Sequence, residues 1–193
     1  MVNKRLMWII EKNGLIQPFQ SGFRKGRSTI DSLIALETEA QYAFINGQQM
    51  IAVFFDMLKA FDNINHAIIL RKLSSIGIRG QMFQFIKQLL ENRHYRVQIG
   101  NELSQGYRQI NGVPQGCVLS PTLFSLAINE LGLNLPREVK PLLFADDLAI
   151  FCRFGNIHDI QLKLQNAINR IKHWSHTTDI QFSVEKNKMP PLQ

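Results

Sequence analysis

The stretch "LLFADDLAIFC", residues 142–152, places two adjacent carboxylates, Asp146 and Asp147, inside an otherwise apolar run. The flanking segments "PLLFA" and "LAIFC" have the length and composition of two strands, which predicts a hairpin with the Asp pair at its connection. An ionised carboxylate is costly to bury without a partner, and a second one beside it raises that cost. The pair therefore needs either a solvated turn, where aspartate is common, or a bound cation.

A second apolar run supplies a third carboxylate. "MIAVFF" (50–55) is six consecutive apolar residues that lead directly into Asp56, and such a run predicts a strand covered on both faces. We expect this strand to pair beside the hairpin, so that Asp56, Asp146 and Asp147 meet at one sheet edge. Magnesium ions would offset their repulsion, and two ions about 4 Å apart stabilise the attacking and leaving oxygens of a phosphoryl transfer.

The other elements follow from hydrophobic periodicity and from end signals. We predict helices over residues 28–47, 65–76, 80–91, 120–134 and 157–175, and a second hairpin over 96–110 that turns at Gly100-Asn101. The first helix spaces Ile30, Leu33, Ile34 and Leu36 for one face, and the last has a buried side of Ile160, Leu164, Ala167, Ile168, Ile171 and Trp174. Together these elements predict an α+β fold in which helices pack on an antiparallel sheet.

Composition favours one globular domain with a polyanionic partner. The chain has 193 residues, 45% of them hydrophobic, and 22 Lys and Arg against 15 Asp and Glu, for a formal charge of +7. A solvated basic surface explains that charge equally well. Cys117 and Cys152 lie in apolar surroundings without metal-ligand spacing, which indicates reduced core thiols. Because no apolar run is long enough to span a bilayer, we expect an intracellular, soluble protein, in the cytoplasm or the nucleus, without a membrane partner.

A loop rich in glycine and proline precedes the 120–134 helix. "NGVPQGCVLSP" (111–121) carries Gly112, Pro114 and Gly116, which let the backbone approach a flat or phosphorylated ligand, although a tight turn into a helix needs similar residues. In "DMLKAFDNINH", we interpret Asp62 and Asn63 as caps of the following helix. We interpret His66 as structural.

Five motifs in order resemble those of the reverse transcriptase domain of non-LTR (LINE-like or Jockey-like) retrotransposons, from about Gln20 to Lys188. "QSGFRKGRST" resembles the fingers block, "FFDMLKAFDNINH" the first catalytic block, "NGVPQGCVLSPTLF" the template and nucleotide block, "FADD" the second catalytic block and "FSVEKNK" the lysine-bearing block. The resemblance implies a right-hand polymerase palm (about 49–189) with partial fingers (about 1–48), taken from a longer retrotransposon polyprotein.

The resemblance also implies an activity and its site. The activity would be RNA-directed DNA polymerase, in which deoxynucleoside triphosphates (dNTPs) extend the 3′-hydroxyl of a DNA primer on an RNA template. Asp56 and Asp146 would ligate two Mg²⁺ ions, with Asp147 as the third carboxylate and the backbone carbonyl of Met57 as a further ligand.

Other positions are matched to nucleotide and template contacts. Phe61 would lie under the sugar of the incoming nucleotide, where a ring clashes with a 2′-hydroxyl. Gln115 and Gly116 would lie along the nucleotide and template, and Lys186 would assist the leaving pyrophosphate. Arg24, Lys25 and Arg27 would contact phosphates. Core packing of Phe61, and plain surface exposure of the lysines and arginines, are the alternatives.

The chain also departs from the family pattern. The more N-terminal fingers block has no counterpart, and the sequence ends at "KNKMPPLQ", where a primer-gripping hairpin and a helical thumb would follow. Asn187 replaces the commoner threonine, and no endonuclease or zinc knuckle is present. We therefore expect a fragment without a thumb. The open alternatives are an inactive truncated remnant that only binds nucleic acid, and another palm enzyme, such as an RNA-dependent RNA polymerase or a nucleotide cyclase.

Overall fold

A computed structural model of the chain describes residues 1–183, and the chain divides into two compact units. The helical unit comprises Met1–Leu15 and Lys59–Ala127, and the sheet unit comprises Ile16–Leu58 and Ile128–Gln193. These units differ from the predicted division into fingers and palm near residue 48. The compact units do not test where the fingers end and the palm begins, so that division stays a prediction.

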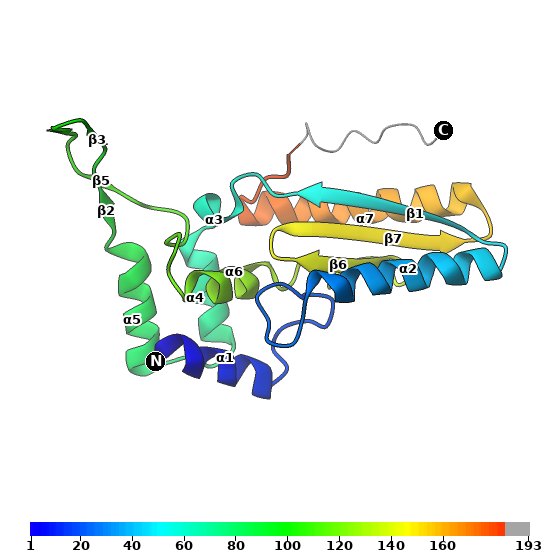
Figure 1. The fold of residues 1–193 in the computed structure, drawn as a ribbon, viewed down its shortest axis with the longest axis horizontal. Coiled ribbons are helices and arrows are strands. Elements are labelled where there is room, and N and C mark those ends of the chain that lie inside the picture. The colour runs from blue at the N-terminus through cyan, green and yellow to red at the C-terminus, as the bar shows by residue number, and fades with distance from the viewer. Residues whose placement is uncertain (184–193) are drawn as a thin grey trace. The chain divides into compact units, whose positions relative to one another are not determined.

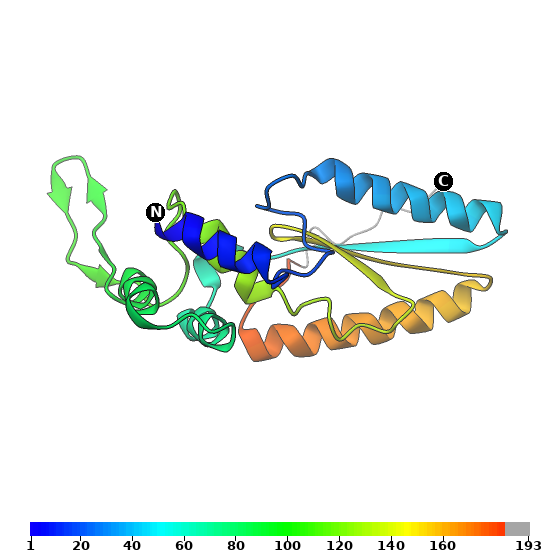
Figure 2. The same cartoon turned by 90° about the horizontal axis from the view of Figure 1, so that it is seen from below.

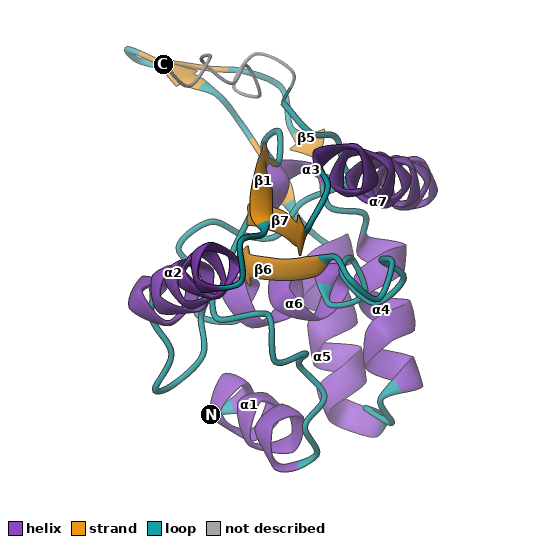
Figure 3. Ribbon diagram, turned by 90° about the vertical axis from the view of Figure 1, so that its right-hand side faces the viewer, coloured by secondary structure: helices purple, strands orange, loops and turns teal. Residues whose placement is uncertain are grey.

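The sheet unit is built on the strands that carry the carboxylates. β1 (Gln49–Asp56), β7 (Asp147–Phe154) and β6 (Lys140–Phe144) form an antiparallel sheet in the order β1-β7-β6 (Figure 1). The predicted hairpin and the pairing of the Asp56 strand beside it are therefore confirmed. Helix α2 (Thr29–Ile45) lies on one face of the sheet and α7 (Ile157–Thr178) on the other (Figures 2 and 3).

Helix α7 covers its face of the sheet as predicted. Asn156 caps the helix through its Oδ1 atom, which accepts a hydrogen bond of 2.9 Å from the amide of His158. Ile160, Leu164, Ala167 and Ile171 are buried, and Ile168 and Trp174 are half-buried. The helical spacing therefore predicted both the element and the side that packs.

Helix α2 forms where predicted, but its apolar face is open. Ile30, Leu33 and Ile34 are 61%, 63% and 56% exposed. Phe54 of β1 is 58% exposed, so the prediction that this strand is covered on both faces is wrong. The physical reason is that β1 is an edge strand and that a groove remains between α2 and the sheet, lined in part by Leu36 and Phe54.

Glu39 ties α2 to the sheet. Its carboxylate accepts a hydrogen bond of 2.9 Å from Nε of Arg153 on β7 and another from Nζ of Lys140 on β6. Burial alone would raise the pKa of Glu39, but the hydrogen bonds from Lys140 and Arg153 outweigh it and hold the pKa below its ordinary value of 4.5. Glu39 is thus an ionised anchor for the helix.

The helical unit packs around helix α6. It contains α1 (Val2–Lys12), α3 (Ala60–Asn63), α4 (His66–Ser75), α5 (Gly80–Glu91) and α6 (Ser120–Ile128). Leu123, Phe124 and Ala127 of α6 are at most 1% exposed, which makes it the core helix. The predicted start of α6 is confirmed, but the predicted end at 134 is wrong, because residues 129–133 form turns. No helix of residues 1–183 is long and apolar enough to cross a membrane.

A long hairpin, residues 92–110, follows α5 and confirms the predicted second hairpin; we call it the arm. Its two antiparallel sides are each made of two short strands. β2 (His94–Tyr95) pairs with β5 (Tyr107–Arg108), and β3 (Gln98–Ile99) pairs with β4 (Glu102–Leu103). Gly100 occupies the turn with a φ of +60°, which suits glycine. The arm extends beyond the helices of its own unit (Figures 1 and 2).

Candidate active site

The three predicted carboxylates lie together at one end of the sheet. Asp56, the last residue of β1, is the register partner of Asp147, the first residue of β7. Cross-strand partners point to the same face and have Cβ atoms about 5 Å apart. Asp146 immediately precedes Asp147 in the turn that joins β6 to β7. Asp56 and Asp146 are half-buried, and Asp147 is exposed.

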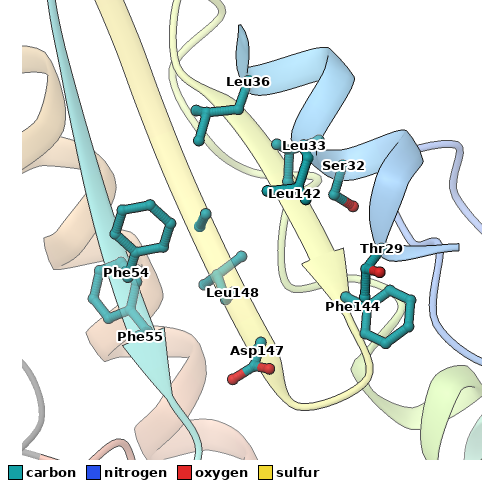
Figure 4. A pocket seen from close by; sticks show the side chains of 11 residues that line it. Thr29, Ser32, Leu33, Leu36, Phe54, Phe55, Leu142, Phe144, Asp147 and Leu148 are labelled. Carbon is teal, nitrogen blue, oxygen red and sulfur yellow. The ribbon is translucent and has the colours of Figure 1, made fainter.

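The surroundings of Asp147 are apolar on the α2 side of the sheet. Figure 4 shows the Asp147 carboxylate at the start of β7, at one end of the groove between α2 and the sheet. Phe144, its partner on β6, and Phe54 of β1 contribute rings to this groove. A cation bound by the carboxylates would therefore lie beside a poorly solvating surface, where its electrostatic effect is strengthened.

The turn that carries Asp146 is supported from outside the sheet. Ala145 has a φ of +55°, and the neighbouring segment 19–22 runs parallel to the outer edge of β6. The amide of Ser21 donates to Leu143 O, and the amide of Leu143 donates to Phe19 O, both at 2.8 Å. A Cβ atom on Gly22 would lie 2.2 Å from the amide nitrogen of Ala145, so only glycine fits there. The "QSGF" part of the predicted fingers block therefore holds the carboxylate turn in place.

The backbone around Met57 is compatible with the predicted metal ligand. Residues 56–58 run antiparallel to residues 181–183. The amide of Leu58 donates to Gln181 O, and Asp56 O accepts from the amide of Ser183, each at 2.8 Å. This bridge uses the carbonyl of Asp56 and leaves that of Met57 out of the pairing, although the Met57 side chain is buried.

The donor set suits Mg²⁺ in an open site. Within residues 1–183, no group of three or more His, Cys, Asp or Glu side chains is arranged to hold a metal ion by itself. All the candidate donors are oxygens, which Mg²⁺ prefers, and this ion commonly takes only one or two protein carboxylates and completes its shell with water and substrate phosphates. Asp56, Asp146 and Asp147 therefore fit Mg²⁺ that binds together with a phosphate-bearing substrate.

The helical unit brings the predicted nucleotide residues together. Phe61, Gln115 and Gly116 line one cavity of about 500 Å³ at the start of α6. The ring of Phe61 stacks on Phe124, with centroids 4.5 Å apart and planes inclined by 19°. Phe61 is only half-buried, so its ring both packs on the core and contributes to the cavity wall.

Residues 61–66 clamp the loop that contains Gln115. The amide of Val113 donates to Phe61 O at 2.8 Å, and Nε2 of the buried His66 lies 2.7 Å from Gly112 O. A Cβ atom on Gly112 would lie 2.6 Å from Asp62 O, so the two backbones are in close contact. The interpretation of His66 as structural agrees with this contact.

Asp62 has a role that sequence reasoning missed. Its Oδ1 atom accepts a hydrogen bond of 2.7 Å from Nε2 of Gln115. The interpretation of Asp62 and Asn63 as helix caps is wrong, because both lie in α3 and Asn65 caps α4 through a 2.8 Å bond from the amide of Ala67. An ionised carboxylate only accepts hydrogen bonds, so Asp62 holds the amide nitrogen of Gln115 and orients its carbonyl. The sequence signal for this role was Asp62 itself, the second carboxylate of the first catalytic motif after Asp56.

The predicted phosphate contacts are basic residues outside the carboxylate site and the cavity. Arg24 donates from Nη1 to Gln17 O and Gln20 O, both at 3.2 Å, so part of its guanidinium supports the segment beside β6. Arg27 and Lys25 are exposed. Lys186 lies outside the described residues, and its role stays a prediction.

The chain also resembles known proteins in sequence. A family model described as "Reverse transcriptase (RNA-dependent DNA polymerase)" matches residues 1–190. The RNA-directed DNA polymerase from mobile element jockey of Drosophila melanogaster is 27% identical over 192 residues, which cover 96% of this chain and 21% of that protein. The Pol polyprotein from the type-1 retrotransposable element R2 of Popillia japonica is 27% identical over 169 residues, or 82% of this chain and 27% of that protein.

A solved structure has the same fold. Telomerase from Candida albicans, in complex with the TWJ fragment of telomeric RNA, superimposes with a TM-score of 0.73 at 11% identity, over 96% of this chain and 34% of that chain. This likeness confirms the predicted α+β polymerase fold with palm and fingers. The chain spans about a fifth of the length of the jockey polymerase and about a quarter of the length of the R2 polyprotein.

Proposed function

Because the chain belongs to the reverse transcriptase (RNA-dependent DNA polymerase) family, we propose that it supplies the polymerase site of a non-LTR retrotransposon reverse transcriptase. The reaction is the addition of dNTPs to the 3′-hydroxyl of a DNA primer on an RNA template, with pyrophosphate as the leaving group. The observation that carries this proposal is the register of Asp56 with Asp147, with Asp146 in the adjoining turn.

In this proposal the carboxylates bind divalent cations. Asp56, Asp146, Asp147 and the carbonyl of Met57 would ligate two Mg²⁺ ions, which supply stabilisation of the attacking and leaving oxygens when bound. The contacts of segment 19–22 keep the Asp146 turn fixed in advance, so the site does not reorganise during the reaction.

The cavity in the helical unit has the task of binding the nucleotide. Phe61 presents its ring to the sugar and excludes a 2′-hydroxyl, which favours deoxynucleotides. Gln115 and Gly116 contact the nucleotide and the template strand. Lys186 neutralises or protonates the pyrophosphate, and Arg24 and Arg27 contact template phosphates.

The partners follow from this activity. They are an RNA template, a DNA primer and dNTPs. The excess positive charge of +7 supports binding of a polyanion. The relatives that share the family are about five times longer, which supports a place for this chain within a larger polyprotein.

Primer extension on an annealed RNA template tests the proposal. We expect Asp56→Asn and Asp146→Asn each to abolish extension, because an amide is a weaker ligand for Mg²⁺ and carries no charge. Asp179→Asn is the matched control, since Asp179 lies at the end of α7 with a φ of +57°, a conformation that asparagine also tolerates. Extension by either site variant at the wild-type rate would refute the assignment.

Two outcomes would select the alternatives. Failure of every variant and of the wild type to extend, with retention of salt-sensitive RNA binding, would identify a nucleic-acid-binding remnant. Carboxylate-dependent extension with ribonucleotides in preference to deoxynucleotides would identify an RNA-dependent RNA polymerase.

A further inference from the structure

The base of the arm, residues 93–96 and 106–108, has an unusual composition. It consists of three arginines, one histidine, two tyrosines and one glycine, and contains no carboxylate. The arm as a whole has one acidic residue, Glu102, which lies beyond the base on β4. The arm base is therefore a cationic and aromatic surface on an otherwise small element.

The side chains of the arm base face solvent, apart from the half-buried Arg93. Tyr95 and Tyr107 are register partners and are 52% and 42% exposed. Their rings stack with centroids 5.7 Å apart and planes inclined by 28°, so they form one aromatic platform. An isolated two-stranded hairpin is marginally stable in water, and the four strands of the arm bury none of their residues. Solvent-exposed aromatic rings on a marginally stable hairpin favour a surface that binds a partner.

Cations surround this platform. His94 and Arg108 are register partners on the opposite face of the ribbon from the tyrosine pair. Arg108 donates from Nε to Glu91 O at 3.2 Å, which fixes the guanidinium near the start of the arm. Arg96 is exposed, and its Nε atom would lie 3.8 Å from a Cβ atom on Gly106, which is an ordinary contact distance. A strand that crosses the edge of the ribbon meets rings on one face and cations on the other.

We propose that the arm base binds a single strand of nucleic acid, with bases stacked on Tyr95 and Tyr107 and phosphates paired with Arg96 and Arg108. Aromatic stacking requires base faces that a duplex hides, whereas cations attract any phosphate backbone, so the combination fits a single strand. The inference rests on the proposed function for the identity of the strand, as template or primer. The chemistry of binding is the same for RNA and DNA.

Fluorescence anisotropy with labelled 20-nucleotide single-stranded RNA, single-stranded DNA and the RNA–DNA duplex tests the proposal. We expect Tyr95→Ala to weaken binding of both single strands about tenfold, because one stacking platform is lost. Arg96→Gln with Arg108→Gln should lower the slope of log affinity against log salt by about 1.4, or about 0.7 for each lost phosphate contact. Single-strand selectivity over the duplex should fall in the tyrosine variant.

Matched control variants distinguish the loss of arm contacts from a general loss of aromatic side chains or of positive charge. Tyr42→Ala removes the third tyrosine of the chain, 54% exposed on α2, and Arg5→Gln with Arg71→Gln removes two exposed arginines elsewhere in the helical unit. Both controls should bind like the wild type within about twofold. Tyr95→Phe keeps the ring and should also bind normally. Circular dichroism melts show whether each variant is folded.

Two results would overturn the proposal. Arm variants that bind as the controls do would exclude the arm as a nucleic-acid contact. A wild-type dimer in sedimentation that becomes a monomer in Tyr95→Ala, with unchanged RNA binding, would assign the arm to contact with a second copy. Because binding is measured without catalysis, failure of primer extension would refute the polymerase proposal and leave the arm result standing.

Discussion

Gly22→Ala should disturb the turn that carries Asp146, although residue 22 is remote from it in sequence. The added Cβ atom would lie 2.2 Å from the amide nitrogen of Ala145 and 3.0 Å from its Cα atom, whereas real Cβ contacts are essentially never below 3.0 Å. Both neighbours are backbone atoms, which cannot rotate away. Segment 19–22 must therefore withdraw from the turn by at least 0.8 Å, the difference between these two distances.

The cost follows from the bonds that this shift stretches. The two hydrogen bonds between segment 19–21 and Leu143, each 2.8 Å long, would exceed the usual limit of about 3.2 Å. Their loss costs about 1 kcal/mol each, and the residual crowding costs about 1 kcal/mol more. A total of about 3 kcal/mol lowers the melting temperature of a chain of this size by about 6–12 °C. Without support from segment 19–22 the turn can shift, and a shift of Asp146 by about 1 Å should reduce extension about a hundredfold.

Thermal melts and primer extension on the same preparations test this prediction. Gly155→Ala is the matched control, because no atom lies within 4 Å of its added Cβ atom and its backbone is ordinary. We expect that control to melt within about 2 °C of the wild type, since an unstrained Gly→Ala change alters stability by less than about 1 kcal/mol. If Gly22→Ala melted and extended like Gly155→Ala, the close contact with the carboxylate turn would be refuted.

Three further predictions concern single side chains. Asp62→Ala removes the acceptor that holds Gln115, so steady-state kinetics should show a KM for dNTP about fivefold higher with kcat little changed; the exchanged pair Asp62→Asn with Gln115→Glu should restore it, and no recovery would contradict a positioning role. Phe61→Val should raise the use of ribonucleotides relative to deoxynucleotides about tenfold in single-nucleotide incorporation, and unchanged selectivity would assign the ring to packing alone. Glu39→Gln should lower the melting temperature by about 2–4 °C at pH 7, because up to about 1 kcal/mol of ion pairing is lost. Since the folded pKa of Glu39 lies below 4.5, this deficit should persist above pH 4.5 and vanish as the pH falls through the folded pKa; melts at a series of pH values that show a constant deficit would exclude the ion pairs as its source.

The sequence was sufficient for most elements of the fold. Apolar runs predicted the β6–β7 hairpin, helical spacing predicted α7 and the Gly100-Asn101 turn predicted the arm, because these signals are local. Helix α1 was not predicted, although Leu6 and Ile10, four residues apart on one helix face, are fully buried. The exposure of Ile30 and Leu33 could not be predicted, since periodicity shows which side chains share a face and not what covers that face.

The site was predictable in part for the same reason. Asp56 and Asp147 end and begin neighbouring strands, so the pattern of strands brings them together. The contact of Gly22 with Ala145 and the bond from Gln115 to Asp62 join segments that are distant in sequence, and no local pattern reports them. Asp62 was interpreted as a cap because aspartate near the start of a helix is common for that reason alone.

The register of β1 with β7 makes the carboxylate site all-or-none. Side chains alternate with a period of two, so a slip of one residue would move Asp56 to the opposite face from Asp147 rather than merely loosen the pair. Substitutions along these strands can therefore be absorbed as long as the pairing holds, whereas a one-residue insertion or deletion between Gln49 and Asp56 that slips the pairing moves Asp56 to the opposite face from Asp147. In copies of such an element that accumulate mutations, length changes in β1 or β7 should extinguish the site before most substitutions do.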